Sequence, residues 1–318
     1  MSISIILQQM GMICILVAIG IFLFKKGVVD NVTSKKLSAI VVDVCNPALI
    51  MGSILSGNMT ATHKDLLTAA LLGVFFYGFM VALGFIIPLI LRAKRDDRKF
   101  YNLMTVYTNT GFLGIPVAKA ILPANAILYV IVINIFYSLL FYTHGMFILG
   151  RGKETGEGGA VQKKRNPLLN LISPGTIMSV LSLVVFWFNI KLPPILANTI
   201  EYVGNATIFL SMTLLGVFIA RSKIASSLKN VRIWIYILIR MIIIPVAIVF
   251  LMRALKFDPT ATLAMCLMAS VPVGNLPMIQ AEKIGENTDI LSSGIAVTTI
   301  VSGVTITVFM SIFSALLI

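Results

Sequence analysis

Charged residues are scarce in this sequence. Only 12% of its 318 residues are Asp, Glu, Lys or Arg, whereas a typical soluble domain carries about 25%. Hydrophobic residues make up 58% of the chain, and the mean hydropathy is +0.99. Such a composition excludes an ordinary water-soluble globular protein and predicts a protein embedded in a membrane.

Residues that commonly perform chemistry or bind metals are also few. The sequence has 2 His and 3 Cys, and Cys14, Cys45 and Cys266 lie in apolar stretches without metal-ligand or disulfide spacing. It contains no phosphate-binding loop ending in Gly-Lys-Ser/Thr, no His-Glu-x-x-His motif and no serine-nucleophile elbow. We therefore expect a protein that is not an enzyme and that needs neither a cofactor nor a metal.

Long apolar runs dominate the chain instead. Each is long enough for a helix of about 20 residues to cross the hydrocarbon core, and strands of about 10 residues with alternating polarity do not fit them. The ten runs are 3–24, 36–57, 65–91, 100–122, 125–149, 168–189, 195–220, 231–254, 259–281 and 290–317. The sequence thus predicts an all-α membrane protein with ten transmembrane helices.

The basic residues predict how these helices are oriented. Of the 25 Lys and Arg residues, 19 lie in the joins after the odd-numbered runs, and the opposite joins hold Lys64, Lys191, Arg253 and Lys256. Because basic residues mark the cytoplasmic side, we expect a multi-pass protein of the cell membrane with both termini outside and the 150–166 loop in the cytoplasm. The net charge of +13 is scattered over several joins, which favours contact with membrane lipid and not with nucleic acid.

A polar, glycine-rich segment divides the chain into two halves. Residues 150–160 read GRGKETGEGGA, a composition typical of a flexible linker. The linker, taken as 150–166, separates a first unit of five helices (1–149) from a second unit of five (167–318). An odd number of helices per half places the second half in the opposite orientation, so a shared fold would make an inverted repeat.

One apolar run in each half is interrupted by glycine and proline. The segments 109–116 (NTGFLGIP) and 270–277 (SVPVGNLP) align with Pro116 opposite Pro277, a separation of 161 residues. Proline removes a backbone donor and glycine permits an unwound backbone. In a membrane, the freed groups are tolerated only where protein or a watery cavity satisfies them. A matched pair of broken segments is therefore the best sequence indication of a transporter binding site.

The chemistry of such a site suits an anion. Two half-helix N-termini directed at one centre would offer unpaired N–H groups and partial positive charge, which favour a carboxylate. Asn109 and Asn275 add side-chain amides that donate or accept. The candidate substrate-binding residues are Asn109, Gly111, Gly114, Pro116, Pro272, Gly274, Asn275, Pro277 and, from another apolar run, Asn46.

Polar residues of the second apolar run are further candidates. Asp43 is a carboxylate inside a predicted membrane helix, which makes it a functional candidate. It would bind a coupling proton or sodium ion, or pair with Lys119 or Arg240. Asn46, which precedes Pro47, would either cap a helix distortion or line the binding pocket.

Three spaced motifs resemble the auxin efflux carrier family, which includes the plant PIN exporters. Asn109-Thr110-x-x-x-Gly114-Ile115-Pro116 resembles the motif of that family's fourth helix. Pro272-x-Gly274-x-x-Pro277, followed by Ala281, resembles its ninth helix, and the segment 289–293 (DILSS) the start of its tenth. The segment 46–49 (NPAL) and the short central loop are similar to the bacterial members, which are permeases for malate and other organic acids.

The resemblance implies a 5+5 inverted repeat in which broken helices 4 and 9 cross. Helices 1, 2, 6 and 7 would form a scaffold, and helices 3–5 and 8–10 a transport domain. It implies a secondary carrier of mono- or dicarboxylates that works by alternating access, with Asn109 at the substrate carboxylate. Asn275 departs from the pattern of the plant members, which have other residues between the glycine and the last proline.

Two other functions stay open at the level of sequence. A sodium-coupled symporter of the bile-acid type shares crossed, broken helices, and a membrane sensor could bind the same ligand without transporting it. A homodimer is compatible with the sequence.

Overall fold

The computed structural model describes residues 3–55, 62–150, 174–221 and 230–317, and these residues are helical almost throughout. They contain no β-strand, only one isolated bridge between Thr108 and Val273. The α-helices are α1 (Ile3–Lys25), α2 (Asn31–Ile40), α3 (Asn46–Leu55), α4 (His63–Ile90), α5 (Arg98–Val106), α6 (Ile115–Ile121), α7 (Ala126–Leu140), α8 (Met146–Gly150), α10 (Pro174–Trp187), α11 (Pro194–Arg221), α13 (Val231–Ile237), α14 (Ile244–Ala254), α15 (Pro259–Ser270), α16 (Leu276–Lys283) and α17 (Asp289–Leu317). The prediction of an all-α protein is confirmed.

Short helical turns of other kinds join several of these helices. Arg95–Asp97 forms a 3-10 turn, η2, before α5. The π-helical turns are η1 (Val41–Cys45), η3 (Thr110–Gly114), η4 (Phe141–Gly145) and η5 (Leu238–Ile243).

Seven helices in the described residues are long and apolar enough to cross a membrane. Three shorter apolar helices accompany them, at Thr110–Ile121, Ile177–Trp187 and Pro259–Ser270. Two of these three belong to the segments predicted to be broken, which explains why they fall short of a full crossing. The structure thus supports a multi-pass membrane protein, while the ten-helix 5+5 arrangement stays a prediction.

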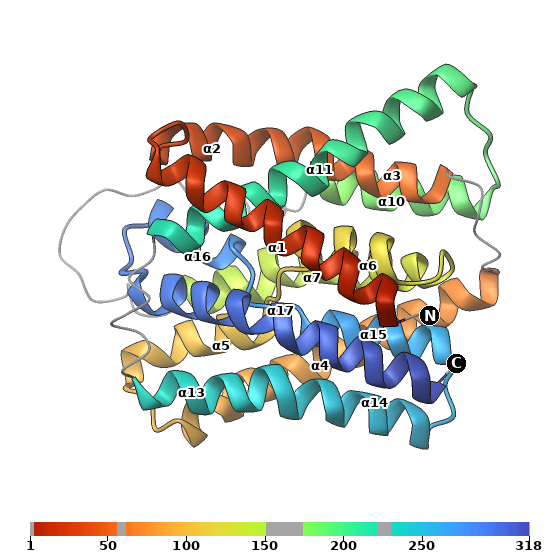
Figure 1. Ribbon diagram of the computed structural model, residues 1–318. Helices are drawn as coiled ribbons and strands as arrows, with labels where there is room; N and C mark the ends of the chain where they lie inside the picture. The colour runs from red at the N-terminus through yellow and green to blue at the C-terminus, as the bar shows by residue number, and fades with distance from the viewer. Residues whose placement is uncertain (1–2, 56–61, 151–173, 222–229, 318) are drawn as a thin grey trace.

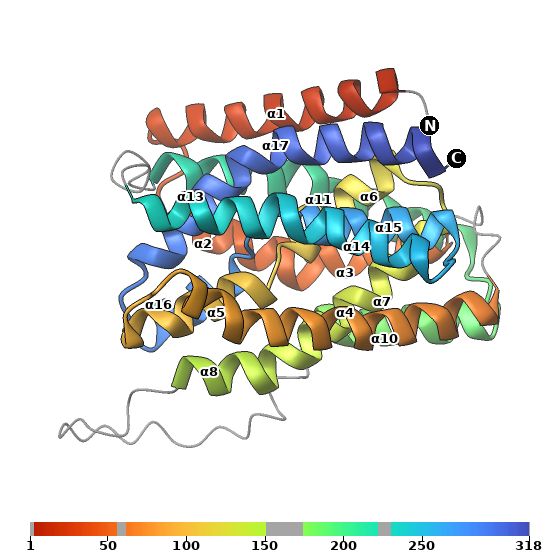
Figure 2. The same ribbon diagram turned by 90° about the horizontal axis from the view of Figure 1, so that it is seen from below.

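The helices run side by side along one direction (Figure 1). Both chain termini lie at the same end of the bundle, and the join between α4 and α5 lies at the opposite end in both views (Figures 1 and 2). This arrangement has the termini and that basic join, with Arg92 and Lys94, on different sides, as the sequence predicts. Which end faces the cytoplasm stays a prediction.

Helices α1, α3, α10 and α11 pack against one another. The close approach of α1 and α11 depends on Gly20 and Gly216, because a Cβ at either position would overlap the backbone of the partner helix. Small residues commonly permit such close helix packing in membranes. These four helices fall in the part of the chain that the sequence assigns to a scaffold.

Helices α4, α5, α7, α14, α15 and α17 form a second set of packed neighbours. Large apolar side chains such as Phe76 of α4, Met104 of α5 and Met268 of α15 are fully buried in it. This set falls in the part assigned to a transport domain. The sets also touch, through α1 with α17 and α10 with α7, and their division into two domains stays a prediction.

Candidate functional site

The two interrupted segments meet in space. Helix α5 ends at Val106 and α15 ends at Ser270, and the extended residues after them run antiparallel. The backbone N–H of Asn109 donates to the carbonyl of Pro272 at 2.8 Å, and the N–H of Gly274 donates to the carbonyl of Tyr107 at 2.9 Å. Each break thus satisfies backbone groups of the other, which is what buried non-helical backbone in a membrane requires.

Gly274 is needed for this close approach. A Cβ at that position would lie 2.9 Å from the carbonyl oxygen of Thr108 and 3.1 Å from that of Tyr107. Both obstacles are backbone atoms held by the bridge, so they cannot swing aside as a flexible side chain would. The glycine predicted at this break therefore serves the crossing itself.

Helix α17 fixes the second break from the other side. The backbone N–H of Val273 donates to Thr298 Oγ1 at 3.1 Å, and that hydroxyl in turn donates to the carbonyl of Gly294 at 2.6 Å. Thr298 is fully buried. The sequence analysis did not identify this residue, because nothing in a long apolar helix marks one threonine among several.

Asn109 caps the first half-helix with the oxygen of its side-chain amide and not with the nitrogen. Its Oδ1 accepts a hydrogen bond from the backbone N–H of Phe112 at 3.2 Å, the usual arrangement of an N-cap asparagine. Its Nδ2 is buried and has no hydrogen-bond partner, and the residue is only 3% exposed. A buried donor without a partner costs about 1–3 kcal/mol, so the crossing holds a directed N–H group ready for an acceptor.

Asn46 reaches this half-helix from α3. An ideal Cβ on Gly111 would lie 3.1 Å from Asn46 Nδ2 and 3.7 Å from Asn134 Oδ1. Asn134 of α7 accepts a hydrogen bond from Thr110 Oγ1 at 2.9 Å, whereas Asn46 Oδ1 is buried without a partner. The structure thus brings together two predicted residues, Asn46 and Gly111, and adds Thr110 and Asn134.

The second half-helix begins directly after Asn275. This residue is 2% exposed, and its Oδ1 has no partner. Among the other predicted residues, Pro116, Pro272 and Pro277 are buried, and a Cβ on Gly114 would lie 3.0 Å from Met268 Cε. Pro277 occupies the second position of α16, where a missing N–H costs little, whereas Pro116 follows turn η3 inside the helical stretch Thr110–Ile121.

Prolines account for three of the four π-helical turns. Turns η1, η3 and η5 each end two residues before a proline, at Pro47, Pro116 and Pro245 respectively. Proline cannot donate to the carbonyl four residues earlier, which favours a local change in helical winding. Such π turns are frequent at functional sites, and here they contain Asp43, Gly111, Gly114 and Arg240.

Asp43 lies on η1 with an exposed side chain. The alternative that it pairs with Lys119 or Arg240 is wrong, because both cations are bound elsewhere. Lys119 Nζ donates to Asn205 Oδ1 at 2.9 Å, and Arg240 Nη1 donates to the carbonyl of Ala269 at 2.5 Å. The coupling role of Asp43 stays a prediction.

Arg240 is the one fully buried charged residue in the described part of the chain. Its single hydrogen bond holds the end of α15 close to the crossing, while Nε and Nη2 have no partner. From the sequence, Arg240 is expected only as a possible partner of Asp43. Its contact with a backbone carbonyl from another helix is not visible in a sequence.

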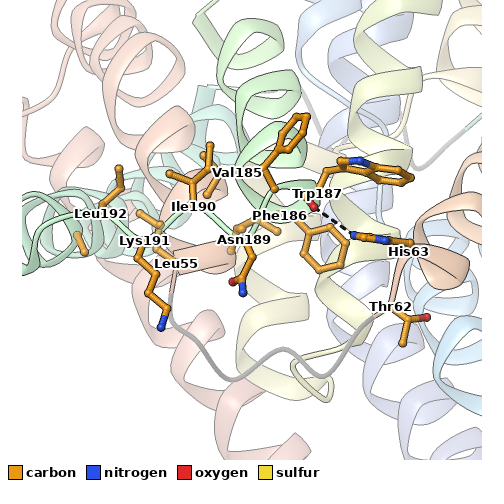
Figure 3. Close-up of a pocket in the computed structure, with 13 residues that line it drawn as sticks. Leu55, Thr62, His63, Val185, Phe186, Trp187, Asn189, Ile190, Lys191 and Leu192 are labelled. Carbon is orange, nitrogen blue, oxygen red and sulfur yellow. Dashed lines mark hydrogen bonds between the residues drawn. The ribbon is translucent and has the colours of Figure 1, made fainter.

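A separate pocket of about 910 Å³ lies near the ends of α3 and α10 and the start of α4. His63 stacks on Trp187 with ring centroids 4.2 Å apart, and its Nε2 lies 3.2 Å from the carbonyl of Trp187 (Figure 3). None of the residues predicted to bind substrate lines this pocket. The crossing and this pocket are therefore different places in the molecule.

Comparison with known proteins gives a family match over almost the whole chain. A family described as "Membrane transport protein" matches residues 5–310. No curated protein matches the chain at a significant level.

Proposed function

We propose, from the premise that this chain belongs to the membrane transport protein family, that it is a secondary transporter of small organic anions. Its substrates would be mono- or dicarboxylates such as malate, carried across the cytoplasmic membrane by alternating access. Family membership and the apolar helices make it a transmembrane transporter. The substrate, the mechanism and the coupling are the proposal.

The unpaired Nδ2 of Asn109 carries this proposal. It is a buried donor at the point where two broken helices meet, and a carboxylate oxygen is the acceptor that completes it. A hydrogen bond to a charged group contributes roughly 1.5–3 kcal/mol. Because the amide is already fixed by its N-cap bond to Phe112, little conformational freedom would be lost when the anion binds.

Asn46 supports alternating access at the same place. Asn46 belongs to the set of packed helices that contains α3. Asn109 and Gly111 belong to the first segment of the crossing, whose turn η3 contacts α7 of the other set as well as α11. A substrate held between them would touch both helix sets. Movement of one set against the other, as in a 5+5 inverted repeat, would then open the site to one side of the membrane at a time.

Asp43 is proposed as the coupling residue, for a proton or a sodium ion. It lies three residues before Asn46 on the π turn that leads into α3, close enough to sense the state of the substrate site. An exposed carboxylate inside a membrane-spanning segment is rare unless it meets water or an ion.

Uptake into proteoliposomes tests the function directly. We expect labelled malate or a related carboxylate to accumulate, and an uncharged amide analogue of the same size not to. Absence of flux for every mono- and dicarboxylate tested, by protein that binds none of them, would contradict the proposal.

Replacement of Asp43 tests the coupling. Asp43→Asn should abolish the dependence of uptake on a proton or sodium gradient. The affinity for the anion should stay within about threefold, well below the tenfold that about 1.4 kcal/mol would give, because Asp43 is not one of the residues proposed to bind the anion. Uptake is measured with and without each gradient. Undiminished gradient dependence in Asp43→Asn would remove Asp43 from the mechanism.

A further inference from the structure

A second cavity of about 930 Å³ lies where α4 ends and α5 begins. This is the end of the bundle opposite the termini (Figure 2), and the sequence predicts that it faces the cytoplasm. The cavity is far along α4 from His63, which lines the pocket of Figure 3. It includes none of the residues proposed to bind the transported anion.

One wall of this cavity is basic. Arg95, Arg98 and Lys99 line it together with Asp96 and Glu286. Lys99 Nζ forms an ion pair with Glu286 at 2.8 Å, so those two charges cancel. Arg95 and Arg98, both exposed, then outnumber Asp96, and the lining keeps a net positive charge.

A buried amide adds a directed polar group. Asn102 of α5 lines the cavity, is only 3% exposed, and has no hydrogen-bond partner at either Oδ1 or Nδ2. It packs against the α4 backbone at Gly84, where an ideal Cβ would lie 2.9 Å from Asn102 Nδ2. Buried amides are normally paired, so this one indicates that a polar ligand group completes the site.

The opposite wall is apolar and opens to the outside of the bundle. Phe85 and Leu89 of α4 line the cavity and are 47% and 56% exposed. On a membrane protein, exposed apolar side chains of this kind face acyl chains. The cavity thus offers cations and an amide beside a surface suited to hydrocarbon.

We propose that this cavity binds an anionic phospholipid of the inner leaflet. The phosphate would lie against Arg95 and Arg98, Asn102 Nδ2 would donate to a phosphate or ester oxygen, and the acyl chains would run along Phe85 and Leu89. Anionic headgroups are recognised by basic residues at the cytoplasmic ends of membrane helices. The assignment goes beyond the proposed function and does not depend on which anion is transported.

The test is binding of phosphatidylglycerol to the purified full-length protein, measured by native mass spectrometry. Phosphatidylcholine with the same acyl chains is the neutral comparison. Wild-type protein should retain phosphatidylglycerol and lose phosphatidylcholine. Arg95→Gln/Arg98→Gln should bind phosphatidylglycerol about ten- to a hundredfold more weakly, as expected for lost charge-assisted hydrogen bonds.

A matched control separates a built site from general attraction between charges. Arg92→Gln/Lys94→Gln removes the same charge from the same join, but neither residue lines the cavity. Its affinity should stay within about threefold of wild type. Because Arg98 Nε also donates to the carbonyl of Ala93 at 3.2 Å, Arg95→Gln alone is measured as well, and it should show a loss without any change in thermal unfolding.

A free anion is the other possible source of a phosphate group. Glycerol 3-phosphate, which lacks acyl chains, should not displace the lipid at equal concentration. Displacement by glycerol 3-phosphate would overturn the lipid assignment in favour of a soluble phosphate. Equal losses in the cavity variant and the control variant, or equal retention of the two lipids, would overturn the site altogether.

Discussion

Asn109 and Asn275 occupy the same place, directly before their half-helices, yet their surroundings differ. Around Asn109 the polar groups are side chains: Asn46, Thr110 and Asn134 all approach the first turn. The two residues before Asn275 are held by contacts of the break itself: Gly274 lies against the carbonyl of Thr108, and the N–H of Val273 donates to the hydroxyl of Thr298. We infer that the first segment recognises the ligand and the second positions it.

The comparison shows how two similar segments of one chain can have different roles. Both segments contain glycine and proline, so both carry the same local sequence signal. In the first segment the amide of Asn109 caps the half-helix through its oxygen and leaves Nδ2 without a partner, which suits the proposed binding of a substrate carboxylate. Replacements in the first segment should therefore mainly lower anion affinity, and replacements in the second should mainly lower stability.

The largest effect is expected from Gly274→Ala. The new methyl group would meet the carbonyl of Thr108 at 2.9 Å, and overpacking of this kind typically costs about 1–3 kcal/mol beyond the loss of the bridge hydrogen bonds. Transport should fall to background, and the thermal unfolding temperature should fall with it.

Gly111→Ala is the matched control for Gly274→Ala. Its methyl group would meet the end of the Asn46 side chain at 3.1 Å, which can shift, and Asn134 Oδ1 at 3.7 Å, an ordinary van der Waals contact. The unfolding temperature should therefore stay near that of wild type. Equal destabilisation by the two replacements would contradict the division between a backbone crossing and a side-chain site.

The next largest effect is expected from Asn109. Asn109→Ala removes the donor and should weaken anion binding about ten- to a hundredfold. Asn109→Asp keeps an oxygen that can cap Phe112 but replaces the donor with a negative charge, so it should bind the anion more weakly still. Affinity is measured by titration at matched amounts of folded protein.

The aspartate variant separates the two roles of the residue. If Asn109 serves only as an N-cap, Asn109→Asp should behave as wild type and Asn109→Ala should mainly lower stability. That pattern would remove Asn109 from ligand recognition.

The smallest effect is expected from Asn275→Ala. The side chain is buried, and the atom left without a partner is the acceptor Oδ1, which cannot hydrogen-bond a carboxylate, whereas the unpartnered atom of Asn109 is a donor. We expect a loss of affinity below about tenfold, less than 1.4 kcal/mol. A loss as large as that of Asn109→Ala, in the same titration, would show that both halves recognise the ligand and would break the comparison.

The sequence by itself determined the class of protein, because apolar runs of about 20 residues permit little other than helices in a membrane. It located the two breaks only approximately. The first break lies at Tyr107–Asn109, whereas Pro116 lies inside the helical stretch Thr110–Ile121. The π turns before Pro47, Pro116 and Pro245 have a local origin, although the sequence analysis did not foresee them.

Only the tertiary structure decided which groups meet. The bridge between Thr108 and Val273 joins residues that are far apart in the chain, and the contact of Arg240 with Ala269 crosses from one helix to another. Side-chain periodicity shows which face of a helix is apolar, but not which backbone atom lies opposite a given side chain. For that reason the sequence identified Asn109 as a candidate, whereas the fold determined that its oxygen is used and its nitrogen is free.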